Sequence, residues 1–459
     1  MFRDGSCLRL ADGLSMELSQ SRDEGKEVEG FRPDVQRIEA MDPGDPMREE
    51  MAAALYRTLA GLPPCPGYPY QEPSDLEGIR ATLPQGFPEA AEAEGELLYD
   101  KVYGAWLGRC AGCLLGQPIE GWRRARIAGF LEETRNQAVR GYLSSLQPHV
   151  IREKYGVEDV ADAYCSWYNN WINNVDCAPE DDDTNYSVLA LRLLETRGRR
   201  FTPENVAELW LSSVPLLRTC TAERVAYRNM ARLIMPPASA THENPYREGI
   251  GAQIRADVYG YVTPGNPAEA AELAWRDACV SHVKNGIYGA MFTAAMISAA
   301  AAEGEQARID PARIIAAGLR QVPPRSRLVE GVRKVLSWAA EGIRLDGAID
   351  LLHSLKDERD PHVGLSAVTN SMVVALAVLY GAMDLPRTLA AAIRCAFDTD
   401  CNAATAGSIV GMARGAGALP AGWTAPLNDT LRTGISGIEK VRISELARRT
   451  CAVARERSK

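Results

Sequence analysis

Four consecutive acidic residues, at positions 180–183, stand directly before a strongly helical segment at 185–194. Carboxylates are favoured at a helix N-terminus, and capping together with the helix dipole accounts for one or two of them. Taken alone, this run is explained equally well as a solvated acidic cap. Its chemical meaning depends on whether other acidic residues share its surroundings.

A second acidic pair, Asp398 and Asp400, favours a buried site. The pair lies between a mostly apolar run at 391–397 and a helix of small residues that begins near Ala403. Both flanking segments are expected to be buried, and uncompensated buried charge is very costly, so a cation is the natural partner. Hard oxygen ligands without a nearby histidine or paired-cysteine cluster favour Mg²⁺, Mn²⁺ or Ca²⁺ over zinc.

Glu120 is a third acidic residue at a place where an apolar helix is expected to end. It follows the segment Leu114-Leu-Gly-Gln-Pro-Ile119, in which Pro118 should terminate the helix and turn the carboxylate outward. Glu120 is a candidate site residue only if the fold brings it close to the two acidic segments.

The helices that must position these acids share a pattern of small residues at every fourth position. Glycine in a helix interior costs about 1 kcal/mol relative to alanine, so its repeated use needs a reason in packing or in a site. Close packing of helix backbones is the simplest reason, and the chemistry is then expected at the helix ends. The three series are Gly104, Gly108, Gly112 and Gly116, then Gly286, Ala290, Ala294 and Ser298, and finally Gly407, Gly411 and Gly415.

The segment 244–257 is predicted to be a loop. Gly249 and Gly251, two positions apart, could present backbone N–H groups to a ligand.

Composition favours a mainly helical protein and argues against several partners. The 459 residues can bury a sizeable core, aromatic residues make up 7%, and alternating β-branched stretches are scarce. A net charge of −9 and scattered Lys and Arg argue against a nucleic-acid partner. The start of the chain has neither an apolar signal segment nor a basic transit peptide, so a cytoplasmic location is expected.

Cysteines and apolar segments both point to a protein without disulfides or membrane spans. Eleven cysteines without a repeated spacing favour free thiols, and the pair Cys110 and Cys113 is interpreted as buried small residues rather than as a redox motif. The uncharged segments 286–302 and 364–383 are alanine-rich, and the second is interrupted by polar residues. We therefore expect them to be central helices of a soluble bundle, with no membrane partner.

Five of these segments, in this order, resemble the motifs of the ADP-ribosylglycohydrolase family. The resemblance covers most of residues 97–420 and implies an all-α fold, a compact orthogonal multi-helix bundle. Residues 96–459 would form the catalytic domain, and residues 1–95, with proline clusters and one expected helix at 49–60, an N-terminal extension packed on it. The similar segments are 104–121 (the opening helix), 181–184 (the first metal motif), 249–255 (the glycine loop), 281–289 (the ligand-side histidine) and 398–400 (the second metal motif).

The resemblance also implies a role for each matching residue. Two divalent cations, Mg²⁺ in first place and Mn²⁺ as the alternative, would hold the ribose of an ADP-ribosyl group while its bond to an acceptor is hydrolysed. The implied metal ligands are Asp181, Asp182, Asp183, Asp398, Asp400 and Cys401. The implied catalytic residues are Glu120, Asp182 and Asp398, and the implied substrate-binding residues are Gly249, Ile250, Gly251, Ala252, Gln253, Arg255 and His282.

Three departures from the family pattern leave alternatives open. Asp181 stands where a hydroxyl residue is usual, Cys113 where an aspartate is common, and Cys401-Asn402 where a hydroxyl residue normally follows the second motif. Either Cys401 or Asn402 could replace that hydroxyl ligand. The ribose acceptor could be a protein side chain, a base or a small metabolite. A N-glycosidase of a small ribosylated metabolite or nucleotide and a non-catalytic ADP-ribose-binding protein remain alternative functions, and the oligomeric state stays open.

Overall fold

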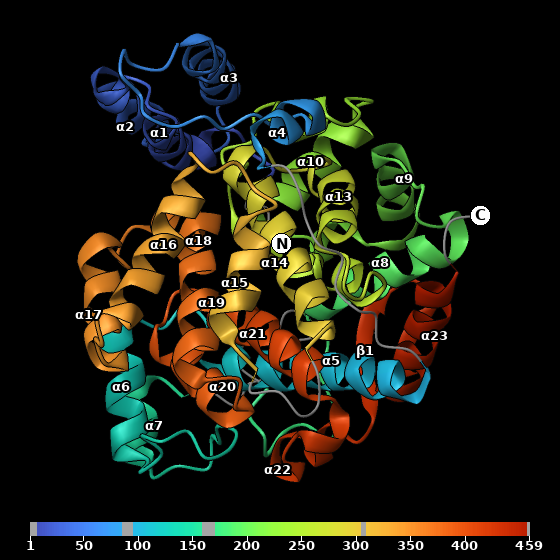
Figure 1. Ribbon diagram of the computed structural model, residues 1–459. Helices are drawn as coiled ribbons and strands as arrows, with labels where there is room; N and C mark the ends of the chain where they lie inside the picture. Colours follow the sequence, from blue (N-terminus) through green and yellow to red (C-terminus); the bar gives the residue numbers. More distant parts are fainter. Residues whose placement is uncertain (1–6, 85–94, 158–169, 304–308, 457–459) are drawn as a thin grey trace.

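Helices dominate the structure and surround a central antiparallel pair (Figure 1). The computed structural model describes residues 7–84, 95–157, 170–303 and 309–456. Within these ranges it contains the α-helices α1 to α23 and one two-stranded sheet, which confirms the expected all-α class. The central pair consists of α5 (Gly95–Gly116) and α21 (Thr399–Arg414).

The two central helices touch through their glycines. A Cβ added at Gly104, Gly108 or Gly112 would lie closer than 3.0 Å to backbone atoms of α21. Gly407 and Gly411 of α21 make the reciprocal contacts with the backbone of α5. The expected packing role of these glycines is thereby confirmed, and it fixes the register of the two helices.

The two uncharged segments form helices that cover the central pair. The first is α14 (Lys284–Ala301) and the second is divided at Ser366 into α18 (Pro361–Leu365) and α19 (Ala367–Gly381). Both α14 and α19 pack on α21, and α14 is almost completely buried. In the part of the chain that the structure describes, no helix is both long and apolar enough to cross a membrane.

All described cysteines are free thiols, and Cys110 and Cys113 are buried in α5.

Further helices complete the main body. The helices are α6 (Arg124–Glu133), α7 (His149–Tyr155), α8 (Asp182–Arg197), α9 (Pro203–Ser213), α10 (Thr221–Ala231), α11 (Ala238–Thr241), α12 (Asp257–Tyr261), α13 (Pro267–Ala278), α15 (Pro311–Leu319), α16 (Arg327–Ala340), α17 (Leu345–Leu355), α20 (Leu385–Arg394), α22 (Ala421–Thr424) and α23 (Ile443–Arg455).

A short β-hairpin near the C-terminus was not expected from the sequence. Its strands β1 (Thr430–Ile435) and β2 (Ile438–Arg442) are antiparallel, with Thr430 opposite Arg442. The backbone N–H of Gly434 donates a 2.8 Å hydrogen bond to Asn185 Oδ1 in the first turns of α8. The hairpin therefore supports the helix that carries the first acidic motif.

The N-terminal extension is more helical than expected. It contains α1 (Leu14–Asp23), α2 (Arg32–Glu39), α3 (Pro46–Gly61) and α4 (Leu76–Thr82), where the sequence indicated a single helix at 49–60. Prolines occupy the first turns of α2 and α3, where a missing N–H costs nothing, so they start helices instead of breaking them. Residues 1–6 and 85–94 lie outside the described residues.

Helices α1, α2 and α3 share a small hydrophobic cluster of their own, separate from the main core, and Figure 1 shows them grouped beside the bundle. We call this group the N-terminal unit. The proline- and tyrosine-rich stretch at 62–75 leads from it along the main body. There Tyr70 donates a 2.8 Å hydrogen bond to Glu330 of α16, and Trp275 of α13 donates one of 2.9 Å to the Ser74 carbonyl.

Candidate metal centre

Both acidic motifs begin a helix. Asp181 is the N-cap of α8, where its Oδ1 accepts a 2.9 Å hydrogen bond from the Asp183 N–H. Asp398 occupies the N-cap position of α21, and Asp400 lies in the first turn. Two helix N-termini therefore direct partial positive charge toward the same carboxylates.

The turn that presents Asp398 has an unusual backbone. Ala396 and Phe397, the two residues before it, have φ angles of 59° and 60°. Left-handed conformations of non-glycine residues cost about 1–3 kcal/mol each and persist only where the surrounding structure holds them. The buried site around this turn thus holds Asp398 in one position.

Glycine packing brings the end of α5 to the start of α21. A Cβ at Gly116 would overlap the backbone of Asp400, and Thr399 Oγ1 donates a 2.9 Å hydrogen bond to the Gly116 carbonyl. The helix ends at Gly116, and a 3₁₀ turn, Gln117–Ile119, leads to Glu120. The segments that carry Glu120 and Asp398–Asp400, distant in the sequence, consequently meet.

Side chains from these segments form three groups that could each hold a metal ion. Within each group the ligand atoms lie within 4.8 Å of one another. The first and second groups share Asp183, and the second and third share Asp400, so the three form one continuous centre. The groups are Cys113, Asp181 and Asp183, then Asp183, Asp400 and Cys401, and finally Glu120, Asp398 and Asp400. Asp182, the one expected ligand that belongs to none of these groups, is half-buried in the first turn of α8.

The carboxylates of this centre are electrostatically unfavourable by themselves. Burial raises the pKa of Asp183 and of Asp400 well above the ordinary value, and the neighbouring carboxylates raise both further. Three buried oxygens, Asp183 Oδ2, Asp398 Oδ1 and Asp400 Oδ1, have no hydrogen-bond partner. Divalent cations would supply the positive charge and the missing partners, so the residues fit a metal centre.

Arg109 is the principal site residue that the sequence analysis missed. It lies on α5, is completely buried, and forms ion pairs with Asp183 Oδ1 at 3.0 Å and Asp257 Oδ2 at 2.7 Å. It also donates to the backbone carbonyls of Asp183 and Ile254. One guanidinium thereby joins α5, the start of α8 and the glycine loop.

A pocket of about 370 Å³ opens beside the centre. Glu120 and Asp398 line it together with Trp122 and Phe397, and the segment 358–365 forms another wall. The glycine loop is next to that wall, because Gly249 pairs with Ser366 in an isolated β-bridge. The acids line the pocket, whereas the loop lies behind the wall at 358–365.

A family model described as ADP-ribosylglycohydrolase matches residues 94–459 of the chain. The protein belongs to the ADP-ribosylglycohydrolase family. Among solved structures, the chain is similar to one from an "ADP-ribosylglycohydrolase-related protein complex", with 18% identity, 79% of this chain and 99% of that chain covered, and a TM-score of 0.46. No curated protein matches the chain. Membership in this family indicates glycosyl hydrolase activity.

The glycine loop of this ADP-ribosylglycohydrolase family member contains a short 3₁₀ helix, Ile250–Arg255, and its residues 250–255 are all buried. A Cβ at Gly251 would overlap the carboxylate of Glu223. At Gly249 an added Cβ would lie 3.0 Å from the Tyr246 carbonyl oxygen and 4.0 Å from His282 Nε2, which is less crowded than at Gly251. The two glycines therefore differ, since the protein itself requires Gly251 while Gly249 faces the histidine.

Arg255, which the resemblance implies as a substrate-binding residue, is held by carboxylates of the protein itself. Its guanidinium is 1% exposed and forms ion pairs with Glu223 and Asp277. The remaining N–H groups donate to Ser281 Oγ and to the carbonyls of Gly251 and Asp277. All of its donors are thus used within the protein, so Arg255 supports the loop from behind.

His282 keeps one ring nitrogen available. Ser281 Oγ accepts a hydrogen bond from Arg255, so its own proton is directed to His282 Nδ1, 2.8 Å away. This arrangement assigns the ring proton to Nε2, which is buried without a partner. Burial also lowers the pKa of His282 well below its ordinary value, which keeps the ring neutral. A neutral N–H donor therefore lies next to Gly249.

The N-terminal unit reaches the glycine loop through buried charges. Arg247 donates to Glu17 of α1 at 2.6 Å and to Glu24, the residue after α1, at 2.9 Å. Glu248, the residue before Gly249, accepts 2.7 Å hydrogen bonds from Gln20 of α1 and from Arg327 of α16. The start of the loop is consequently held between the N-terminal unit and the main body.

Proposed function

We propose that the protein hydrolyses the bond between the anomeric ribose carbon of an ADP-ribosyl group and its acceptor, with two divalent cations in the acidic centre. The observation that carries this proposal is the continuous chain of metal-capable groups, linked through Asp183 and Asp400, that ends at Glu120 in an open pocket. The family match to residues 94–459 supports the same reaction class.

Five aspartates would take part in holding the cations: Asp181, Asp182, Asp183, Asp398 and Asp400. When bound, the cations would supply the positive charge that orients the ribose hydroxyls beside the anomeric carbon. Mg²⁺ or Mn²⁺ suits the oxygen ligands of this set. Asp182, which lies at the edge of the groups, would act on a cation that is already held by its neighbours.

Glu120 would carry out the proton transfer. Departure of the leaving group builds positive charge on the ribose, which nearby carboxylates stabilise. Glu120 lines the pocket, where its carboxylate could take a proton from water during attack on the anomeric carbon. Asp398, held by the strained turn, lines the same pocket and would contribute negative charge there.

The glycine loop would bind the rest of the ligand. Gly249 permits close backbone approach, and the Nε2–H of His282 would donate to a ligand oxygen. The buried side chains at 250–255 hold this backbone in place. In this proposal residues 96–459 bind the ligand, and residues 1–95 stabilise the start of the glycine loop. The contacts of α1 with Arg247 and Glu248 are consistent with this.

The decisive experiment compares Glu120→Gln with Glu358→Gln, a carboxylate at the same pocket but outside the metal groups. Single-turnover release of ADP-ribose would be measured on a panel of ADP-ribosylated and ribosylated compounds, with metal content and ADP-ribose affinity determined in parallel. With the metal sites saturated, Glu120→Gln should slow release by about 10²–10⁴-fold, and Glu358→Gln should not.

Four outcomes would change the conclusion. An unchanged rate in Glu120→Gln removes this residue from the mechanism. Release only from small ribosylated compounds favours the N-glycosidase alternative. A wild type that binds ADP-ribose and releases nothing from the panel favours a binding protein. Full metal content in both Asp183→Asn and Asp400→Asn would contradict the shared centre.

A further inference from the structure

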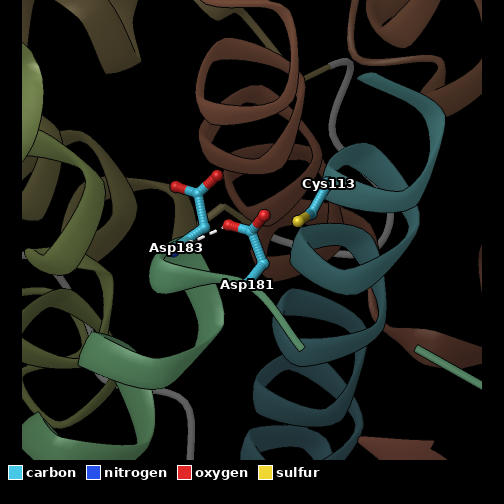
Figure 2. Close-up of side chains that lie close together, drawn as sticks. All are labelled: Cys113, Asp181 and Asp183. Carbon is cyan, nitrogen blue, oxygen red and sulfur yellow. Dashed lines mark hydrogen bonds between the residues drawn. The ribbon is translucent and has the colours of Figure 1, made fainter. Parts of the chain in front are cut away.

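Two of the three metal-capable groups contain a cysteine sulfur. Cys113 Sγ lies with Asp181 and Asp183, and Cys401 Sγ lies with Asp183 and Asp400. Figure 2 shows the first group, in which the Cys113 sulfur on α5 faces the carboxylate of Asp181 at the start of α8. Both cysteines are buried, with 2% and 7% of their surface exposed. The proposed mechanism uses neither thiol.

The thiols lie beside the carboxylates. Cys113 Sγ is within 4.8 Å of carboxylate oxygens of Asp181 and Asp183, and Cys401 Sγ is within 4.8 Å of carboxylate oxygens of Asp183 and Asp400. In contrast, the third group, Glu120, Asp398 and Asp400, offers oxygen atoms alone. The centre therefore differs in chemistry between its two ends, although Asp183 and Asp400 connect them.

Sulfur ligands select different cations from oxygen ligands. Mg²⁺ prefers oxygen and binds thiolates poorly, whereas Zn²⁺, Co²⁺ and Fe²⁺ accept sulfur together with carboxylate. The unpartnered Asp183 Oδ2, fully buried, lies in both groups that contain sulfur and offers a further ligand there.

We propose that the centre binds two unlike cations, a borderline cation such as Zn²⁺ or Co²⁺ at the end that contains Cys113 and Cys401, and a hard cation such as Mg²⁺ at Glu120, Asp398 and Asp400. The inference rests on the proposed function, because it takes the acidic groups to be metal ligands. Each thiol that becomes a ligand releases its proton to solvent as the cation binds.

Spectroscopy of the full-length protein tests the sulfur ligation without any assay of activity. Metal-free wild type would be titrated with Co²⁺, and a thiolate-to-cobalt charge-transfer absorption should appear. Cys113→Ser and Cys401→Ser should each reduce this absorption. Cys110→Ser is the matched control, because Cys110 is buried one turn away on the same helix and belongs to none of the groups among the described residues.

Metal competition gives an independent measure. Zn²⁺ should displace Mg²⁺ from one position in the wild type and leave the second position to Mg²⁺. Loss of a sulfur ligand should weaken Zn²⁺ binding by at least about 10–100-fold and leave Mg²⁺ affinity nearly unchanged. X-ray absorption of the zinc-loaded wild type should show sulfur at about 2.3 Å, a result that does not depend on any variant folding.

Different results separate the inference from the proposed function. Cobalt bound by oxygen alone, with no charge-transfer absorption and no zinc–sulfur distance in the wild type, overturns the inference while the proposed metal centre stands. Equal loss of absorption in Cys110→Ser also overturns it. Failure of the wild type to bind any divalent cation would overturn both.

Discussion

Replacing Arg109 with methionine should strongly destabilise the protein. Methionine fills much of the volume of the arginine but leaves Asp257, which is completely buried, without its ion pair. The Asp183 and Ile254 carbonyls would also lose their donor. Removing one partner of a buried ion pair costs about 3–5 kcal/mol, and we expect a loss of unfolding free energy in that range.

Urea denaturation of metal-free protein measures this loss, and Arg124→Met is the matched control. Arg124 pairs with Asp350 at 2.7 Å, but the two side chains are 32% and 68% exposed, so its loss should cost at most about 1 kcal/mol. The double variant Arg109→Met with Asp257→Asn removes the stranded charge and should be less destabilised than the sum of the single changes. A loss below about 1 kcal/mol in Arg109→Met would refute the reasoning.

Three further predictions concern the helix pair, the loop and the histidine. Gly112→Ala should separate α5 from α21, because its Cβ would overlap the Ala403 backbone. It should lower the free energy of unfolding by about 1–3 kcal/mol and also weaken metal binding. An unchanged melting temperature would contradict this. Gly251→Ala should lower the melting temperature, because its Cβ would clash with the buried carboxylate of Glu223. Gly249→Ala should mainly weaken ADP-ribose binding. Thermal unfolding measures the first effect and calorimetric titration the second. The pKa of His282 is lowered in the folded protein, so below its ordinary pKa the unfolded chain binds a proton that the folded chain excludes. Lowering the pH through 6.5 should therefore destabilise the wild type more than His282→Gln. Equal pH profiles of the two proteins in urea denaturation would contradict this prediction.

The sequence predicted the acidic motifs well because their signals are local. An acidic run before a helix and an acidic pair between apolar segments mark helix N-termini wherever the chain folds. The spacing of Gly104, Gly108 and Gly112 likewise predicted a backbone contact, although it could not name α21 as the partner. Convergence of Glu120 with Asp398 and Asp400 follows from this contact, which only the fold reveals.

Residues whose role depends on distant partners were not predictable in the same way. Arg109 pairs with residues 74 and 148 positions later in the chain, and no local pattern names them. A signal did exist, since an arginine inside an apolar glycine-striped helix must find a buried acid. Arg255 was assigned to the ligand through the family resemblance, and its partners Glu223 and Asp277 stand on other helices, where no local pattern links them to it. The hairpin at 430–442 was too short to stand out among helical patterns.

Because α5 and α21 touch through their backbones, the distance between Glu120 and Asp400 is set by the main chain and not by side-chain packing. Helices that meet through large side chains can shift when those side chains repack, but glycine on both sides leaves nothing to rearrange. A one-residue insertion in either helix would rotate the residues beyond it by about 100° and carry Glu120 or Asp400 out of the centre. Variation that alters substrate choice is therefore expected in the pocket walls at 121–123 and 358–365, whose lengths can change while the distances between the metal ligands stay constant.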